Sequence, residues 1–176
     1  VFRVDASTIM GSGHVMRCLT LAEKLKKNGS DITFISRAHE GNLNGLISDK
    51  GMKVAELSAP FSRSDAVGNG GSDDYAEWRG VTQEQDIRET VKVLGKTIPD
   101  WLIVDHYALS EKWEKTVHHS VQNIMVIDDL ANRSHDCDLL LDQNWFENMG
   151  TRYEGLVPAN CTKLLGPEYA LMRPQF

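Results

Sequence analysis

The chain has 176 residues, of which 19 are Lys or Arg and 25 are Asp or Glu, so its formal net charge is −6. With 41% hydrophobic residues, this composition excludes a disordered chain, a collagen-like chain and a disulfide scaffold, and the length suits one sizeable domain. The acidic balance and the lack of a Lys/Arg-rich run argue against nucleic acid as a main partner. No apolar stretch approaches the roughly 18–20 residues that span a bilayer, so we do not expect a membrane partner either.

The cysteines and the two ends of the chain bear on its cellular context. Cys18, Cys137 and Cys161 are odd in number and widely separated, which suits reduced thiols better than a disulfide framework. No signal-peptide pattern begins at Val1, and we therefore expect a cytoplasmic location. Both ends are apolar and do not resemble fraying termini, so we expect a domain cut from a longer protein.

The first third of the sequence alternates between strand-like and helix-like patterns. Apolar residues with helical spacing between His14 and Asn28 predict a helix that ends at Gly29. In chain order, the predicted elements are a strand at 1–6, a turn at 10–13, a helix at 14–28, a strand at 31–36, a helix at 43–50 and a strand at 53–57.

Residues 58–74 interrupt this alternation with a segment rich in Gly and Ser. A loop of this length is uncommon inside a compact domain and is often functional, so we consider that it could close over a ligand. Beyond it, Thr82 begins a helix with Gln85 at the capping-box position, Pro99 ends it, and Ile98 is expected in its buried stripe. The later predictions are a strand at 101–104, a helix at 110–120 and strands at 123–127 and 139–141.

Strands that alternate with helices and are apolar on both faces indicate a parallel sheet covered on two sides. We therefore predict an α/β fold with a Rossmann-like parallel sheet and helices on both faces. In such sheets, ligands bind outside the carboxyl ends of the strands. The polar residues that follow the predicted strands are Asp5, Gly11, Gly13, His14, Asp105, His106, Tyr107, Asp128, Asp129, Asp142, Gln143 and Asn144. These residues are expected to converge at one edge of the sheet.

The turn at 11–14 is the first of these clusters. Gly11 and Gly13 let the backbone approach a ligand closely, and free N–H groups at the start of the following helix suit an anion. The positive end of that helix disfavours an imidazolium, so His14 is suited to act as a neutral general base. A tight turn whose histidine only caps the helix fits the same pattern.

Two acidic clusters leave alternatives open. Tyr107 could donate to a substrate oxygen and Asp105 could orient a neighbouring histidine, or Asp105 could simply cap a turn at the strand end. Asp128 and Asp129 could hold a metal, hold sugar hydroxyls, raise one another's pKa or form a solvated strand end.

Motifs for common cofactors are incomplete. The run at 95–97 resembles the end of a P-loop, but Thr90 stands where the first Gly is required. The turn at 11–16 lacks the third Gly of a dinucleotide fingerprint, because Met16 occupies that position. The His and Cys residues lack strong zinc spacing, so we expect neither a cofactor nor a metal.

Six motifs, taken together, resemble a known family. They are Gly-x-Gly-His-x-x-Arg at 11–17, Asp-Tyr-Ala-Glu-Trp at 74–78, Asp-Trp-Leu-Ile-Val-Asp-His-Tyr at 100–107, Ile-Asp-Asp-Leu-Ala at 127–131, His-Asp-Cys-Asp-Leu-Leu-Leu-Asp-Gln-Asn at 135–144 and Leu-Gly-Pro-Glu-Tyr-Ala-Leu-Met-Arg-Pro at 165–174. In this order they are similar to the UDP-2,4-diacetamido-2,4,6-trideoxy-β-L-altropyranose hydrolases of pseudaminic acid biosynthesis, nearly end to end.

The resemblance implies a GT-B-type enzyme with two Rossmann-like domains, of which residues 1–176 are similar to the N-terminal one. The C-terminal nucleotide-binding domain, which would complete the cleft, is not in this chain, so we expect the chain alone to be inactive. The implied reaction is metal-independent hydrolysis of the anomeric C–O bond, which releases UDP with inversion. His14 would activate water, and Tyr107 would bind substrate or position that water. Substrate contacts are expected from Gly11, Gly13, Arg17, Asp5, Asp105, His106, Asp128, Asp129 and Asn144.

Two other functions fit the same residues. A glycosyltransferase could use the turn at 11–14 to deprotonate an acceptor hydroxyl, although the sequence shows no apolar or basic patch for a membrane acceptor. A non-catalytic domain could bind a sugar nucleotide without turning it over.

Overall fold

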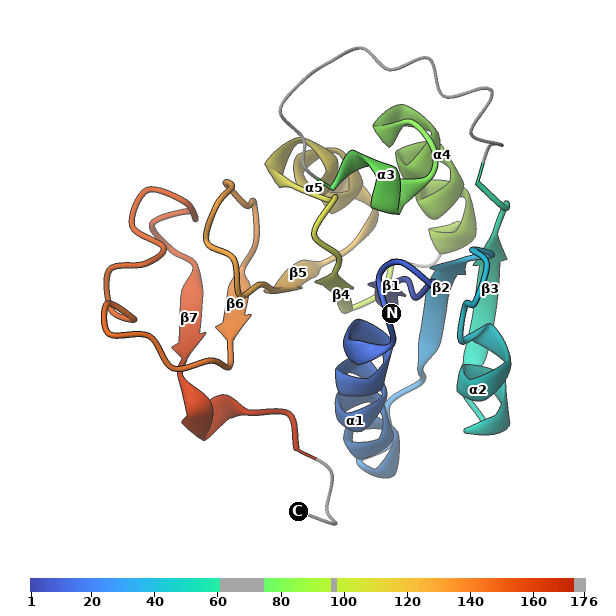
Figure 1. The fold of residues 1–176 in the computed structure, drawn as a ribbon, viewed down its shortest axis with the longest axis horizontal. Coiled ribbons are helices and arrows are strands. Elements are labelled where there is room, and N and C mark those ends of the chain that lie inside the picture. Colours follow the sequence, from blue (N-terminus) through green and yellow to red (C-terminus); the bar gives the residue numbers. More distant parts are fainter. Residues whose placement is uncertain (61–74, 96–97, 173–176) are drawn as a thin grey trace.

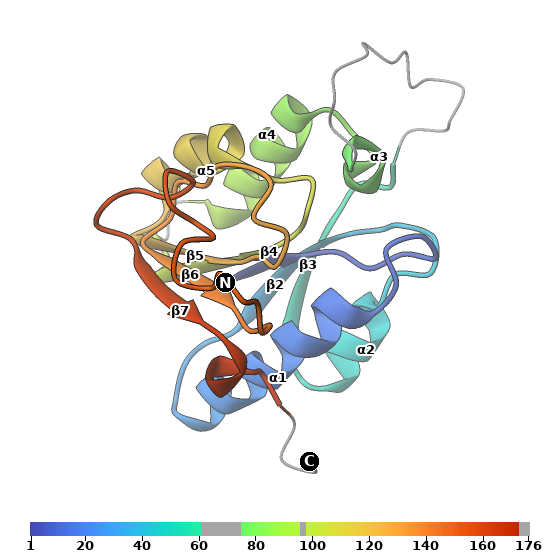
Figure 2. The same ribbon diagram turned by 60° about the vertical axis from the view of Figure 1, so that its left-hand side comes forward.

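The computed structural model describes residues 1–60, 75–95 and 98–172, which build a seven-stranded parallel sheet (Figure 1). The strand order is β3-β2-β1-β4-β5-β6-β7, and every neighbouring pair is parallel. Figure 2 shows α1 and α2 on one face of the sheet and α3, α4 and α5 on the other. The predicted Rossmann-like α/β fold is confirmed.

The elements follow the predicted alternation closely. The strands are β1 (Phe2–Val4), β2 (Thr33–Arg37), β3 (Lys53–Leu57), β4 (Trp101–Asp105), β5 (Asn123–Ile127), β6 (Leu139–Asp142) and β7 (Thr162–Leu165). The described helices are α1 (Gly13–Lys27), α2 (Asn44–Asp49), α3 (Ala76–Arg79), α4 (Gln83–Leu94) and α5 (Glu111–Val117), with 3₁₀ turns η1 (His118–Ser120) and η2 (Pro167–Tyr169).

The core has two parts, one on each face of the sheet. Successive side chains of a strand point to opposite faces. In β4, Leu102 and Val104 therefore pack with Trp113 of α5, whereas Ile103 packs with Val15 of α1. This double coverage explains why the strands are apolar at nearly every position.

The structure differs from the predictions in three respects. Helix α4 ends at Leu94 because Gly95 adopts a φ of +63°, and Ile98 is 57% exposed instead of buried. The four-residue helix α3 and the edge strand β7 were not predicted, since neither has enough apolar periodicity. The helix predicted at 110–120 is divided into α5 and η1. The loop predicted at 58–74 lies outside the described residues from position 61 onward.

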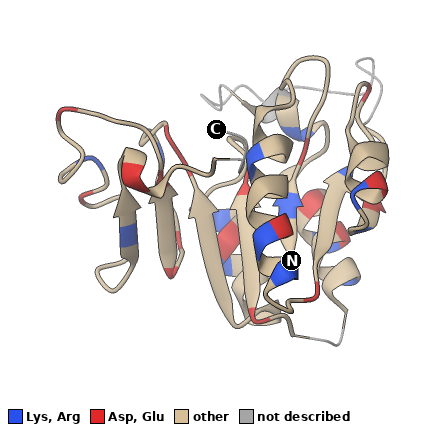
Figure 3. Cartoon of the chain, turned by 90° about the horizontal axis from the view of Figure 1, so that it is seen from below, with Lys and Arg blue, Asp and Glu red and all other residues tan. Residues whose placement is uncertain are grey.

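Charged residues of both signs are interspersed along the described elements (Figure 3). Within the described ranges, no helix combines the length and the apolar character needed to cross a membrane.

Candidate active site

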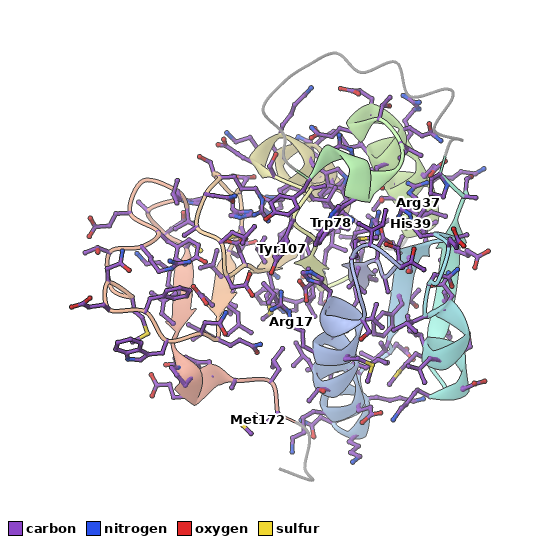
Figure 4. All side chains as sticks on the ribbon, viewed as in Figure 1. Arg17, Arg37, His39, Trp78, Tyr107 and Met172 are labelled. Carbon is purple, nitrogen blue, oxygen red and sulfur yellow. The ribbon has the colours of Figure 1, made fainter. Side chains whose placement is uncertain are left out.

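The candidate active site lies at the carboxyl end of the sheet, between β1 and β4. This is the point where the strand order changes direction, which is the usual ligand position in open α/β sheets. The strand register places Val4 beside Asp105. Figure 4 shows Arg17, Trp78 and Tyr107 close together where α1 begins.

His14 and Asp105 form the centre of the site. Nδ1 of His14 lies 2.5 Å from Oδ1 of Asp105. Burial alone would raise the pKa of Asp105, but hydrogen bonds from Arg17 and His14 outweigh it and lower that pKa to about 2. An ionised carboxylate can only accept, so Nδ1 of His14 donates to it, and in a neutral imidazole the lone pair is then on Nε2.

The Nε2 lone pair of His14 is open to a ligand. The His14 side chain keeps 10% of its surface exposed, and Nε2 has no hydrogen-bond partner among the described residues. Of the two interpretations of Asp105, the structure has the one in which this residue orients a histidine. His14 is thus held in the tautomer that a general base requires.

Arg17 holds the second side of Asp105. Its Nε donates to Oδ2 of Asp105 at 2.6 Å and its Nη2 donates to Oδ1 at 2.7 Å. Its Nη1 donates to Oδ2 of Asp129 at 3.1 Å. Arg17 follows His14 by three residues on α1, so both side chains reach the same carboxylate from one face of the helix. The whole guanidinium is engaged by carboxylates.

Asp129 links this group to Tyr107 and Asn144. Oδ1 of Asp129 accepts from the Tyr107 hydroxyl at 2.5 Å, and Oδ2 accepts from Nδ2 of Asn144 at 3.4 Å. Burial and the hydrogen bond to Asp129 raise the pKa of Tyr107 above its usual value. Tyr107 therefore stays a neutral phenol whose oxygen can still accept a hydrogen bond from a ligand.

An aromatic group packs against His14. The ring of Tyr107 meets the His14 ring edge-on at 4.6 Å, and Trp78 stacks on Tyr107 at 5.4 Å between ring centroids. Tyr75 lies 5.0 Å from Trp78 and 5.3 Å from Tyr107. Tyr75 and Trp78 were not among the predicted site residues. The Asp-Tyr-Ala-Glu-Trp motif at 74–78 was the signal that could have identified them.

Gly11 and Gly13 leave the turn before α1 open. Gly11 adopts a φ of +74°, which favours glycine. Among the described residues, no atom lies within 4 Å of the position that a Cβ would occupy on either glycine. Ser12, the N-cap residue of α1, makes no side-chain capping bond. The backbone here is accessible, as predicted for a turn that a ligand approaches closely.

Asp5 and His106 lie beneath the site, with 1% and 3% of their surface exposed. Asp5 belongs to a buried charge cluster, which we define as Arg3, Asp5, Arg37 and Asp86. Arg3 donates to Asp5 and to Asp86 at 2.6 Å each, and Arg37 donates to Asp86 at 2.8 Å. The expected substrate contacts of Asp5 and His106 stay predictions.

Asp128 and Asp129 are neighbours in sequence but belong to different networks. Asp128 is fully buried and accepts from Arg133 at 2.7 Å and from the Tyr153 hydroxyl at 3.1 Å. Burial alone would raise the pKa of Asp128, but the charge of Arg133 outweighs it and lowers that pKa. Only Asp129 is brought into contact with Arg17 and Tyr107.

Metal binding was one interpretation of the acidic residues. In the ranges that the structure describes, no group of three or more His, Cys, Asp or Glu side chains is arranged to hold a metal ion. The carboxylates of the site are instead paired with Arg17, His14 and Tyr107.

The fold and the site together define a Rossmann-like α/β protein with a carboxylate-oriented histidine at the carboxyl edge of its sheet. No family model matches the chain. Over 177 aligned residues it is 31% identical to the UDP-2,4-diacetamido-2,4,6-trideoxy-β-L-altropyranose hydrolase of Campylobacter jejuni, and the alignment covers all of this chain and 52% of the relative. The chain thus spans about half the length of the curated relative that it matches. The resemblance inferred from the motifs is confirmed.

Proposed function

We propose that this chain is the base-carrying part of a UDP-sugar hydrolase. The observation that carries the proposal is the orientation of His14 by Asp105, in a chain similar along its whole length to the relative of that name. The proposed substrate is UDP-2,4-diacetamido-2,4,6-trideoxy-β-L-altropyranose. The products are UDP and the free sugar, as part of pseudaminic acid biosynthesis.

In the proposed reaction, Nε2 of His14 takes a proton from a water molecule as that water attacks the anomeric carbon. The C–O bond to the phosphate breaks, and UDP leaves with the electron pair. Attack on the face opposite the leaving group inverts the anomeric carbon. Asp105 stabilises the imidazolium that forms, and Arg17 keeps Asp105 in place through its paired hydrogen bonds.

Tyr107 and Asn144 are proposed to contact the sugar or the attacking water. The Tyr107 hydroxyl donates to Asp129, so its oxygen presents a lone pair toward a ligand hydroxyl. The aromatic group of Tyr75, Trp78 and Tyr107 excludes water from one side of His14. UDP is a good leaving group, so we propose that its departure needs only electrostatic help, which the remaining half of the protein would supply.

The test is a phosphorus and proton NMR time course with the full-length protein, the UDP-linked diacetamido sugar and EDTA, without an acceptor. We expect UDP and free sugar to form together, and the first anomer to be the inverted one. Unchanged substrate under these conditions would reject hydrolysis, and turnover that appears only with an added acceptor would indicate a transferase.

The His14→Ala variant should lose about 10²–10⁴-fold in kcat, the usual contribution of a general base. His119, an exposed histidine in η1, provides the matched control, and His119→Ala should retain full activity. Residues 1–176 alone should release no UDP in the same assay. Wild-type turnover by His14→Ala would remove this residue from the mechanism.

A further inference from the structure

Asp105, the last residue of β4, and the two residues that follow it contact different partners. Asp105 and Tyr107 both contact His14, at 2.5 Å between Nδ1 and Oδ1 and at 4.6 Å between ring centroids. The side chain of His106, which lies between them in sequence, is buried and faces Asp5 instead. The placement of both His14 partners therefore depends on the backbone at His106.

Both ring nitrogens of His106 face polar atoms inside the protein, but only Nδ1 makes a well-aligned hydrogen bond. Nδ1 accepts from the backbone N–H of Ala108 at 3.1 Å, and Nε2 lies 3.2 Å from Oδ2 of Asp5. Because Nδ1 accepts, the proton of the neutral ring is on Nε2, facing the carboxylate. Burial lowers the pKa of His106, which keeps the ring neutral. Arg133 also donates to the His106 carbonyl at 3.4 Å.

Asp5 is a rigid anchor for His106. Its Oδ1 accepts from the Arg37 backbone N–H at 2.7 Å and from Arg3 at 2.6 Å. Its Oδ2 faces His106, and Nε2 of His39 lies 3.6 Å from the same oxygen. Burial alone would raise the pKa of Asp5, but the charge of Arg3 and the neighbouring histidines lower it well below its usual range. Asp5 is thus a fixed carboxylate tied to β1 and β2.

We propose that His106 and Asp5 form a positioning pair for the candidate active site: their contact sets the backbone of residues 105–108, and so aligns Asp105 and Tyr107 with His14. In this role the pair acts through Asp105 and Tyr107, since both of its own side chains are buried. This inference rests on the proposed hydrolase function for its kinetic test but not for its structural one.

The kinetic test compares three substitutions in the full-length protein. His106→Ala should lower kcat about 10- to 100-fold and leave KM within about twofold, since misplacement by about 1 Å can cost 10²-fold in rate. His106→Gln places an amide N–H where Nε2 faced Asp5, and should recover most of this loss. The kcat of Asp5→Asn should be closer to the kcat of His106→Ala than to the kcat of His106→Gln.

A second buried histidine separates positioning from general destabilisation. His135 is the matched control, because it is 2% exposed and its Nδ1 lies 2.7 Å from Glu114. His135→Ala should lower thermal stability without changing kcat per folded molecule.

A second measurement does not depend on turnover. Nitrogen NMR of ¹⁵N-histidine-labelled full-length protein should place the His14 proton on Nδ1 and the His106 proton on Nε2. In His106→Ala, the His14 signals should lose this single-tautomer pattern, and in His106→Gln they should keep it. Unchanged His14 signals in His106→Ala would overturn the proposal even for an active enzyme. If the full-length protein proves inactive, only the hydrolase proposal fails, and these spectra still decide the positioning role.

Discussion

Two His–Asp pairs lie next to each other at the end of β4: an outer pair, His14 with Asp105, and an inner pair, His106 with Asp5. They differ in the contacts of the second ring nitrogen. In the outer pair, Nδ1 of His14 donates to Asp105, and Nε2 has no partner among the described residues. In the inner pair, Nε2 of His106 faces Asp5, and Nδ1 is occupied by the Ala108 N–H. Asp105 fixes the tautomer of His14 and the Ala108 N–H fixes that of His106, but only the outer pair leaves a lone pair for chemistry.

The largest expected effect comes from Asp105→Asn. The amide can donate to Nδ1, which would place the His14 proton on Nε2 and remove the base. We expect kcat of the full-length protein to fall about 10²–10⁴-fold, while the fold is kept. Stopped UDP-release assays check this, with Asp49→Asn on the exposed surface of α2 as the control. Activity within threefold of wild type would show that the outer pair does not set the tautomer.

Asp86→Asn should instead act on stability. The substitution leaves Arg3 and Arg37 with one carboxylate fewer in a buried cluster, and breaking such a pair costs about 3–5 kcal/mol. Urea denaturation should give this loss in the free energy of unfolding, while kcat per folded molecule is unchanged. A loss below about 1 kcal/mol would mean that the cluster tolerates an unpaired charge.

Low pH should weaken both the buried charge cluster, through Asp86, and the candidate active site, through Asp105. The pKa values of Asp86 and Asp105 lie near 2 in the folded protein, below the ordinary value of 3.8, so both carboxyls stabilise the fold above pH 3.8. This contribution, on the order of 2 kcal/mol each, is lost as the pH falls from 3.8 through 2. Urea denaturation between pH 6 and pH 2 measures it, and Asp105→Asn should show a shallower decline. A free energy of unfolding that stays constant across this pH range would contradict the lowered pKa values of both carboxyls.

The smallest effect should come from Tyr107→Phe. It removes the hydroxyl that donates to Asp129 but keeps the ring that packs on His14. We expect about a tenfold lower kcat, equivalent to one hydrogen bond of about 1–1.5 kcal/mol. Steady-state kinetics of the full-length protein check this, and Tyr169→Phe, which lies in η2, serves as the control. A loss beyond 10²-fold would assign the hydroxyl a direct catalytic role.

The sequence predicted where the site lies better than how its residues pair. Helical and strand periodicity located nearly all elements and brought Gly11, His14, Asp105 and Asp129 to one edge of the sheet. Periodicity is a local property, however, and the partner of Asp105 is 91 positions away in sequence. Whether that carboxylate orients a histidine or caps a turn is decided by the strand order, which no local pattern contains.

The inner pair illustrates the same limit more strongly. Asp5 and His106 follow strands as ligand-edge residues do, and no local pattern indicated that both are buried. The buried Asp5 carboxylate is paired with Arg3, which also pairs with Asp86, a residue 83 positions away in sequence. Helix α3, which contains Trp78, was not predicted, because four residues are too few to show helical periodicity.

The central position of β1 has a consequence for the order in which the protein is synthesised. Phe2 pairs with Phe34 on one side but with Ile103 on the other, so one edge of β1 lacks its neighbour until about 100 more residues have been made. At roughly 5–20 residues per second, that edge stays open for about 5–20 s on the ribosome. A charge on an open strand discourages pairing with other chains. We therefore expect Arg3 to discourage pairing of the nascent strand with other chains until the buried charge cluster has folded around it.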